Sequence, residues 1–227
     1  MALMRAAEQL GELTDRLVFV GGGVVDVLVS DPNSPPARPT IDVDVIADIE
    51  ALVDYYKLGA LLKARGFGEV IEGNVICRWR CGDLILDVMP TSEEVFGFGN
   101  RWYQSALEYS IRVVLPNGGP ISVIDQAHFI ATKLEAFASR GKQDIFVSHD
   151  FEDIVAVVNG FPELVDQVAH STPDLRGYLC QWFNQLLKRS DLPDAIEGHL
   201  AAIHDSNQRS AVVLQRFALI AKLETGS

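Results

Sequence analysis

Apolar and polar residues alternate most regularly over residues 41–47, where Asp42 and Asp44 point one way and their apolar neighbours point the other. This period of two is typical of a β-strand with one buried face and one acidic face. Five shorter apolar runs are typical of further strands: residues 17–20, 75–80, 84–88, 111–115 and 121–123. We therefore expect a β-sheet built from the first half of the chain.

Helical spacing, with apolar residues three and four positions apart, dominates the rest of the chain. In the first half it covers residues 2–15, 24–29 and 49–65. After Asp125 it recurs in six segments: residues 125–140, 150–159, 163–170, 174–188, 192–204 and 208–223. Turn residues at positions 82–83 and 116–119 predict two β-hairpins.

These patterns together predict an α+β fold. A mixed sheet flanked by helices is expected over residues 1–124. A helical half is expected over residues 125–227, packed on the sheet domain and completing the active site.

Composition and charge narrow the class of protein. Hydrophobic residues make up 48% and charged residues 22% of the 227 positions, as in ordinary globular proteins. No apolar run reaches the roughly 18 residues that a membrane span needs, and the N-terminus lacks the order of a signal peptide, so we expect a cytoplasmic protein without a membrane partner. Thirty-one acids against nineteen bases give a formal charge of -12, which disfavours long nucleic acid unless basic residues cluster. The candidates for such a cluster are Arg78, Arg80, Arg101, Lys188 and Arg189.

The acidic strand is the sharpest candidate for chemistry. Asp42 and Asp44 leave the same face of the strand, with Cα atoms roughly 6.6 Å apart. Two adjacent carboxylates repel each other unless a cation lies between them, and carboxylate oxygens suit Mg²⁺. Asp87 is the acid within the apolar run 84–88 and is the best third carboxylate, whereas Asp83 is explained as a turn residue. The alternative is an exposed acidic strand face that binds no metal.

Three consecutive glycines, Gly21, Gly22 and Gly23, stand between an apolar run and a predicted helix. Glycine there lets backbone N–H groups approach a phosphate. Asp26 occupies the place where a dinucleotide fingerprint needs its third glycine, and no Gly-Lys-Ser/Thr follows as in a Walker loop. Tight packing is the alternative reason for glycine at these positions.

The order of these features resembles the DNA polymerase β-like nucleotidyltransferase superfamily. Residues 38–44, Arg-Pro-Thr-Ile-Asp-Val-Asp, resemble the Arg-x-Ser/Thr-x-Asp-x-Asp segment of AbiEii-type nucleotidyltransferases, the toxin components of type IV toxin–antitoxin pairs. Residues 133–140 and 148–154 resemble the Lys…Ala…Arg…(Lys/His)-Asp-x-x-Asp signature of that family. The resemblance covers about residues 17–155. It departs at Gly23, where the family usually has Ser or Thr, and at His149, where many relatives have Lys.

The resemblance implies an enzyme that moves a nucleoside monophosphate from an NTP to an RNA 3′ end or a protein hydroxyl, with Mg²⁺ as cofactor. A cognate antitoxin is a further implied partner. The implied metal-binding and catalytic residues are Asp42, Asp44 and Asp87, the last as metal ligand or base. The implied nucleotide-binding residues are Gly21, Gly22, Lys133, Arg140 and Asp153.

Other interpretations stay open at this point. Lys133 and Arg140 are seven residues apart and share one side of a helix, which also fits a solvated basic edge. Asp150 and Asp153 are expected together at the rim of the next helix, where they also fit N-terminal capping and the helix dipole. For the whole chain the main rival is a catalytically inactive nucleotidyltransferase-fold protein that binds or regulates a partner. A metal-dependent phosphohydrolase would use the same acids.

Overall fold

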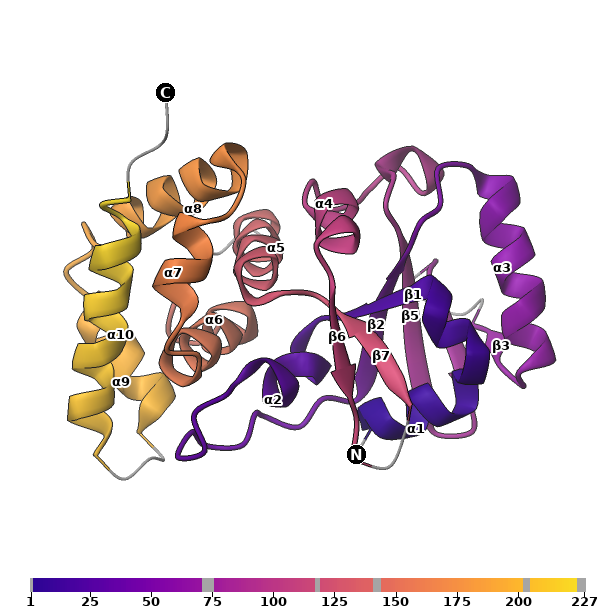
Figure 1. Ribbon diagram of the computed structural model, residues 1–227, viewed down its shortest axis with the longest axis horizontal. Helices are drawn as coiled ribbons and strands as arrows, with labels where there is room; N and C mark the ends of the chain where they lie inside the picture. The colour runs from indigo at the N-terminus through magenta and orange to yellow at the C-terminus, as the bar shows by residue number, and fades with distance from the viewer. Residues whose placement is uncertain (1, 71–75, 117–118, 141–143, 202–204, 224–227) are drawn as a thin grey trace. The chain divides into compact units, whose positions relative to one another are not determined.

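The computed structural model describes residues 2–70, 76–116, 119–140, 144–201 and 205–223 (Figure 1). The chain divides into two compact units. The first consists of the residues up to Val24 together with Arg38–Asp125, and the second of Val25–Ala37 together with Gln126–Ser227. The predicted mixed sheet with flanking helices and the helical C-terminal half are both confirmed.

The first unit is built on a seven-stranded sheet in the order β3-β4-β5-β2-β1-β7-β6, counted over the described residues. β2 and β5 are parallel, as are β1 and β7, and the other neighbours are antiparallel. The strands are β1 Leu17–Val20, β2 Asp42–Ala47, β3 Gly68–Glu69, β4 Arg78–Cys81, β5 Leu84–Pro90, β6 Ile111–Val114 and β7 Pro120–Val123. The β4–β5 and β6–β7 hairpins lie where the turn residues predict them, whereas Val75, which the sequence analysis placed at the start of β4, lies outside the described residues. Short β3 was not predicted.

Two helices supply much of the packing around this sheet. α1 (Ala2–Leu10) contacts β2 and β5 and continues as a 3₁₀ segment over Gly11–Arg16, so the predicted helix 2–15 is helical in two parts. α3 (Leu52–Ala64) lies against Trp79 of β4, whose indole N–H donates to the Tyr55 hydroxyl at 3.0 Å. A side chain at Gly59 of α3 would come within 2.9 Å of the Trp79 ring, so glycine permits this close approach. The unit also contains 3₁₀ segments Gly22–Val24 and Glu93–Val95 and helix α4 Tyr103–Glu108.

The second unit is helical. Its core contains the fully buried rings of Phe129, Phe151, Phe183 and Phe217. Its helices are α2 Val25–Leu28, α5 Gln126–Ser139, α6 His149–Gly160, α7 Leu164–Ala169, α8 Pro173–Leu186, α9 Leu192–Leu200 and α10 Ser206–Ile220. None of the helices in the described part of the chain has the length and apolar character of a membrane span.

The segment Val25–Ala37 belongs to the helical unit by its contacts, although it precedes most of the sheet in the chain. Its Leu28 carbonyl accepts a hydrogen bond from the Gln126 side chain at 3.0 Å. The backbone N–H groups of Ser30 and Asp31 both donate to the carbonyl of Gly160 at 3.0 Å. A run rich in proline has few backbone donors of its own, so these contacts with α5 and α6 decide where the segment packs.

Candidate active site

The register between β2 and β5 brings the three predicted acids onto one face of the sheet. Asp44 lies opposite Asp87, and Asp42 lies opposite Ile85. Since side chains alternate along a strand, Asp42, Asp44 and Asp87 project from the same side. The alternate residues, among them Val43 and Leu86, are fully buried in the core. The acids therefore stand on a rigid part of the sheet rather than on a loop.

The glycine turn adjoins this acidic face. β1 and β2 are antiparallel with Val20 opposite Asp44, so the residue after Val20 comes directly beside that carboxylate. Gly21 has a φ of +70°, in the region that favours glycine, and a Cβ added there would overlap Asp44 Oδ2 and lie 2.7 Å from its Cγ. Gly21 thus makes room for Asp44. A Cβ added at Gly23 would lie 3.5 Å from the Thr40 hydroxyl.

Arg78 is the site residue that sequence reasoning missed, having been considered only as part of a basic cluster. Its Nε donates to Asp87 Oδ1 at 2.8 Å and its Nη2 to Asp87 Oδ2 at 2.7 Å. The same Nη2 also donates to Asp42 Oδ2 at 3.1 Å. The hydrogen bonds to Asp87, together with the charge of both carboxylates, raise the pKa of Arg78 above its usual value.

The hairpin turn contains the signal that would have identified this contact. Cys81 pairs with Leu84 across the two-residue turn, so counting back three positions pairs Arg78 with Asp87. Directly opposed side chains in an antiparallel pair lie close enough for an ion pair. A two-residue hairpin predicted from the sequence therefore predicts the Arg78–Asp87 pair as well.

The acidic face fits a divalent cation in the kind of ligand it offers but is not closed around one. Among the described residues, no group of three or more acids, histidines or cysteines is arranged to hold a metal ion. Asp42 and Asp44 supply carboxylate oxygens of the type that Mg²⁺ prefers. Both oxygens of Asp87, however, are engaged by Arg78. The three predicted ligands, Asp42, Asp44 and Asp87, thus lie on one face of the sheet, and the guanidinium of Arg78 lies between two of them.

The residues predicted in the helical half form a second cluster, within the second unit. Lys133 of α5 lies 2.7 Å from Asp153 Oδ2 and 3.2 Å from Asp150 Oδ1 in ion pairs, and its side chain is 11% exposed. Arg140, the residue directly after α5, lies 2.7 Å from Asp150 Oδ2 while its side chain remains 71% exposed. Lys133 is therefore a buried charge partner of two acids rather than a residue of a solvated edge. Of the two bases, Arg140 is the one accessible to a ligand.

Asp150 does not cap its helix. Ser148 is the N-cap of α6, and its hydroxyl accepts a hydrogen bond from the Phe151 N–H at 3.3 Å. Asp150 and Asp153 are each only 2% exposed, so they lie inside the unit rather than at its rim. Their burial is tolerated because Lys133 and Arg140 supply opposite charge.

The five basic residues considered as candidates for a nucleic-acid cluster are placed as follows. Arg78 binds acids as described, Arg189 pairs with Asp191 at 2.8 Å, and the Arg101 guanidinium lies 4.8 Å from the centre of the Trp102 ring. Arg80 is exposed on β4. Lys188 and Arg189 belong to the second unit and the other three to the first.

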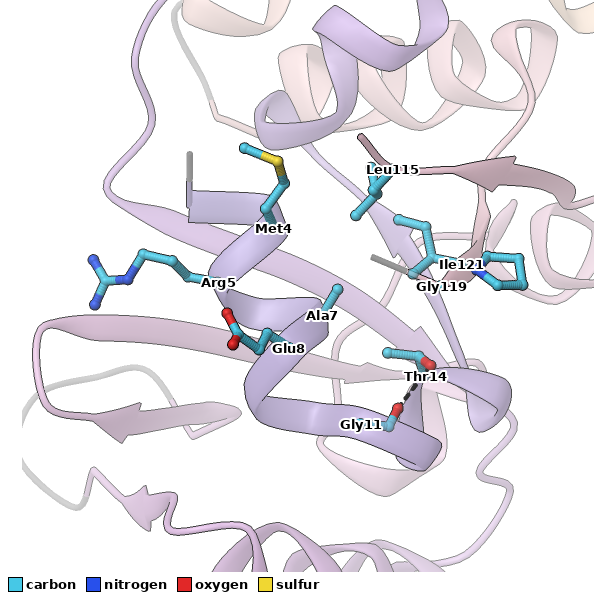
Figure 2. A pocket seen from close by; sticks show the side chains of 10 residues that line it. Met4, Arg5, Ala7, Glu8, Gly11, Thr14, Leu115, Gly119 and Ile121 are labelled. Atoms are coloured by element: carbon cyan, nitrogen blue, oxygen red, sulfur yellow. Dashed lines mark hydrogen bonds between the residues drawn. The ribbon is translucent and has the colours of Figure 1, made fainter. Parts of the chain in front are cut away.

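A cavity of about 530 Å³ lies elsewhere in the first unit, between α1 and the β6–β7 hairpin (Figure 2). Met4 and Ala7 of α1 line it together with Leu115 and Ile121 of the hairpin. Because β7 runs parallel to β1 and begins beside the start of that strand, the cavity lies at the opposite end of β1 from the glycine turn. It is therefore separate from the acidic face.

Comparison with solved structures identifies the type of fold. The antibiotic-resistance factor ANT(2'')-Ia has a TM-score of 0.51 and 15% identity, and the match covers 83% of this chain and 97% of that one. The chain has a nucleotidyltransferase-like fold. JHP933 from Helicobacter pylori matches with a TM-score of 0.48 and 16% identity over 97% of this chain and 89% of that one. A candidate nucleotidyltransferase from H. pylori matches with a TM-score of 0.45 and 14% identity over 97% and 92%. No family model and no curated protein matches the sequence.

Proposed function

We propose that this protein is a Mg²⁺-dependent nucleotidyltransferase, which moves a nucleoside monophosphate from an NTP to an acceptor hydroxyl and releases pyrophosphate. The observation that supports this most is the placement of Asp42, Asp44 and Asp87 on one face of a nucleotidyltransferase-like sheet, with the glycine turn directly beside Asp44. Three acids on one strand face repel one another, and a single arginine, Arg78, offsets only part of that negative charge.

In this proposal Asp42 and Asp44 hold Mg²⁺, with Asp87 as the third ligand or as the base that takes the proton of the acceptor hydroxyl. The ion, when bound, supplies positive charge against the phosphates and the leaving pyrophosphate. The backbone N–H groups of Gly21 and Gly22 hold the terminal phosphates in this proposal. Gly21 has no side chain to block a close approach, and Asp44 already lies directly against it. Each of these residues belongs to the first unit.

The proposed nucleotide-binding residues of the helical unit are Lys133, Arg140 and Asp153. Arg140 is suited to a phosphate, because its exposed guanidinium keeps donors beyond the one used by Asp150. Lys133 of α5 and Asp153 of α6 form a buried ion pair that links the two helices. In this proposal the pair supports the structure around Arg140 and also contributes charge toward the nucleotide.

The acceptor that we propose is an RNA 3′ end or a protein hydroxyl, in keeping with the resemblance to the AbiEii-type toxins, and a cognate antitoxin would then be a partner. A small compound with hydroxyl groups is a further acceptor to test, because the chain shares the fold of an antibiotic-resistance factor. A formal charge of -12 favours the smaller acceptors over long RNA.

The deciding experiment incubates the purified protein with each α-³²P-labelled NTP, Mg²⁺ and, in separate reactions, cellular RNA, protein extract or an antibiotic rich in hydroxyls. Label transferred by the wild type and lost in the Asp42→Ala/Asp44→Ala variant supports the proposal and names base and acceptor class together. Asp83→Asn is the matched control, because Asp83 lies on the same hairpin as Asp87 but pairs with Arg5, and it should keep full activity.

A second candidate is a catalytically inactive binding or regulatory protein of the same fold. The observation that favours it is the engagement of both Asp87 oxygens by Arg78. Absence of label from every acceptor, together with an unchanged melting temperature on addition of each NTP with Mg²⁺, would leave this second candidate. Release of phosphate instead of pyrophosphate would point to a phosphohydrolase that uses the same acids.

A further inference from the structure

Arg78 places a positive charge at the position where the acidic face would bind a cation. One nitrogen, Nη2, lies 2.7 Å from Asp87 Oδ2 and 3.1 Å from Asp42 Oδ2. Two carboxylates on neighbouring strands thus share a single cationic atom. A divalent ion shared by the same two oxygens would have to occupy the space of that nitrogen, and a guanidinium and a metal ion close together would repel each other.

The strand that carries Arg78 shows that this arrangement is specific to one residue. Arg80 stands two positions further on the same face of β4, opposite Ile85 instead of an acid, and is exposed. Arg78 lies opposite Asp87, and its side chain is 27% exposed. A general excess of basic residues on this face would not produce a bidentate contact, which requires the planar donor pair of one arginine aligned with one carboxylate.

We propose that Arg78 is a positioning residue that competes with the divalent cation for Asp42 and Asp87 and so sets the metal affinity of the site. In the metal-free protein the guanidinium balances the charge of the acids and holds Asp87 in place. Binding of the ion would require Arg78 to leave Asp42 and Asp87. This inference rests on the proposed function for the identity of the metal ligands but concerns a step that precedes any transfer.

The test is a titration of the full-length, metal-free protein with Mn²⁺, followed by electron paramagnetic resonance of the free ion. Arg78→Gln removes the charge and keeps a similar length. We expect it to bind Mn²⁺ at least about tenfold more tightly, because a neighbouring arginine typically lowers the affinity of a carboxylate for a proton by one to three powers of ten and opposes a metal ion in the same direction. Arg80→Gln is the matched control and should bind as the wild type does. Arg78→Lys keeps the charge without the planar fork and should fall between the two.

Thermal unfolding separates this effect from a loss of structure. Without metal, Arg78→Gln should melt at a lower temperature than the wild type, because Asp87 loses its bidentate partner, and added Mn²⁺ should raise its melting temperature by more than that of the wild type. If Arg78→Gln does not fold without metal, the Mn²⁺ affinity and melting temperature of Arg78→Lys are compared with those of the wild type instead.

Two results would overturn the competition. Unchanged or weaker Mn²⁺ binding in Arg78→Gln, with nucleotide transfer intact in the wild type, would show that Arg78 only supports Asp87, and the proposed function would stand. Absence of Mn²⁺ binding from the wild type and from Arg78→Gln alike would remove both this inference and the metal dependence proposed above.

Discussion

Replacement of Gly21 by alanine tests whether the glycine turn is required by Asp44. The added methyl group meets two obstacles. At a φ of +70° an alanine pays roughly 1–2 kcal/mol for the left-handed backbone. It also lies 2.7 Å from Cγ and 2.9 Å from Cβ of Asp44, so a turn of the aspartate side chain alone does not remove the overlap.

The magnitude follows from these two terms. Forced overlap in a packed region costs roughly 1–3 kcal/mol, which brings the expected loss in the free energy of unfolding for Gly21→Ala to about 2–5 kcal/mol. Gly82→Ala is the matched control, because Gly82 has a φ of +61° and no atom within 4 Å of an added Cβ. It should show only the backbone term.

Equilibrium unfolding in urea measures both variants, and the difference between them isolates the contact with Asp44. The double variant Gly21→Ala/Asp44→Ala removes the two closest atoms of the aspartate, so it should recover roughly 1–2 kcal/mol relative to the sum of the single changes. Equal losses in Gly21→Ala and Gly82→Ala, or strict additivity in the double variant, would refute the reasoning.

Three further predictions concern other parts of the molecule. Lys133→Met should lower the free energy of unfolding by about 3–5 kcal/mol, because it removes the positive charge beside two buried carboxylates. Adding Asp153→Asn should restore part of that loss in the same urea assay. A loss below about 1 kcal/mol in Lys133→Met would contradict a buried ion pair. Burial raises the pKa of the Cys77 thiol to about 12, so between pH 9 and 12 the unfolded chain releases a proton that the folded protein retains. Stability should therefore fall as the pH rises through this window, by at most about 1.4 kcal/mol per pH unit, and Cys77→Ala should flatten that dependence in unfolding measurements at several pH values. Gly160→Ala puts a methyl group 2.5 Å from a carbon of Val29 and should lower the free energy of unfolding by roughly 1–3 kcal/mol. Gly198→Ala adds a methyl group in open space within α9, so the stability should be unchanged or higher. The melting temperatures of the two variants test this difference.

Much of the candidate site is predictable from the sequence, because it depends on local periodicity. Alternation around Asp42 and Asp44 defines a strand and places both acids on one face. The lone acid in the next apolar strand identifies Asp87, and the two-residue turn before that strand fixes its register with Arg78. Composition alone describes Arg78 as one base among several, whereas the hairpin register pairs it with Asp87.

Burial of charge is harder to predict from spacing. Lys133 and Asp153 have the positions expected of residues at the edge of their helices, yet the pair is enclosed. A helical period gives the direction of each side chain but not how much neighbouring structure covers it. Whether a charged residue is exposed or paired inside depends on residues from other helices, which the period does not contain.

The sequence by itself determined the type and approximate limits of most strands and helices, the end of α3 before Gly66, and the shared face of Asp42 and Asp44. Each of these depends on neighbours within one or two turns of chain. Only the tertiary structure decided that the turn at Gly21 lies against Asp44 and that Val25–Ala37 packs with the helical unit. Both depend on contacts between residues far apart in the chain. Such contacts form because their packing and hydrogen bonds outweigh the entropy lost in closing the intervening loops, a balance that no local pattern records.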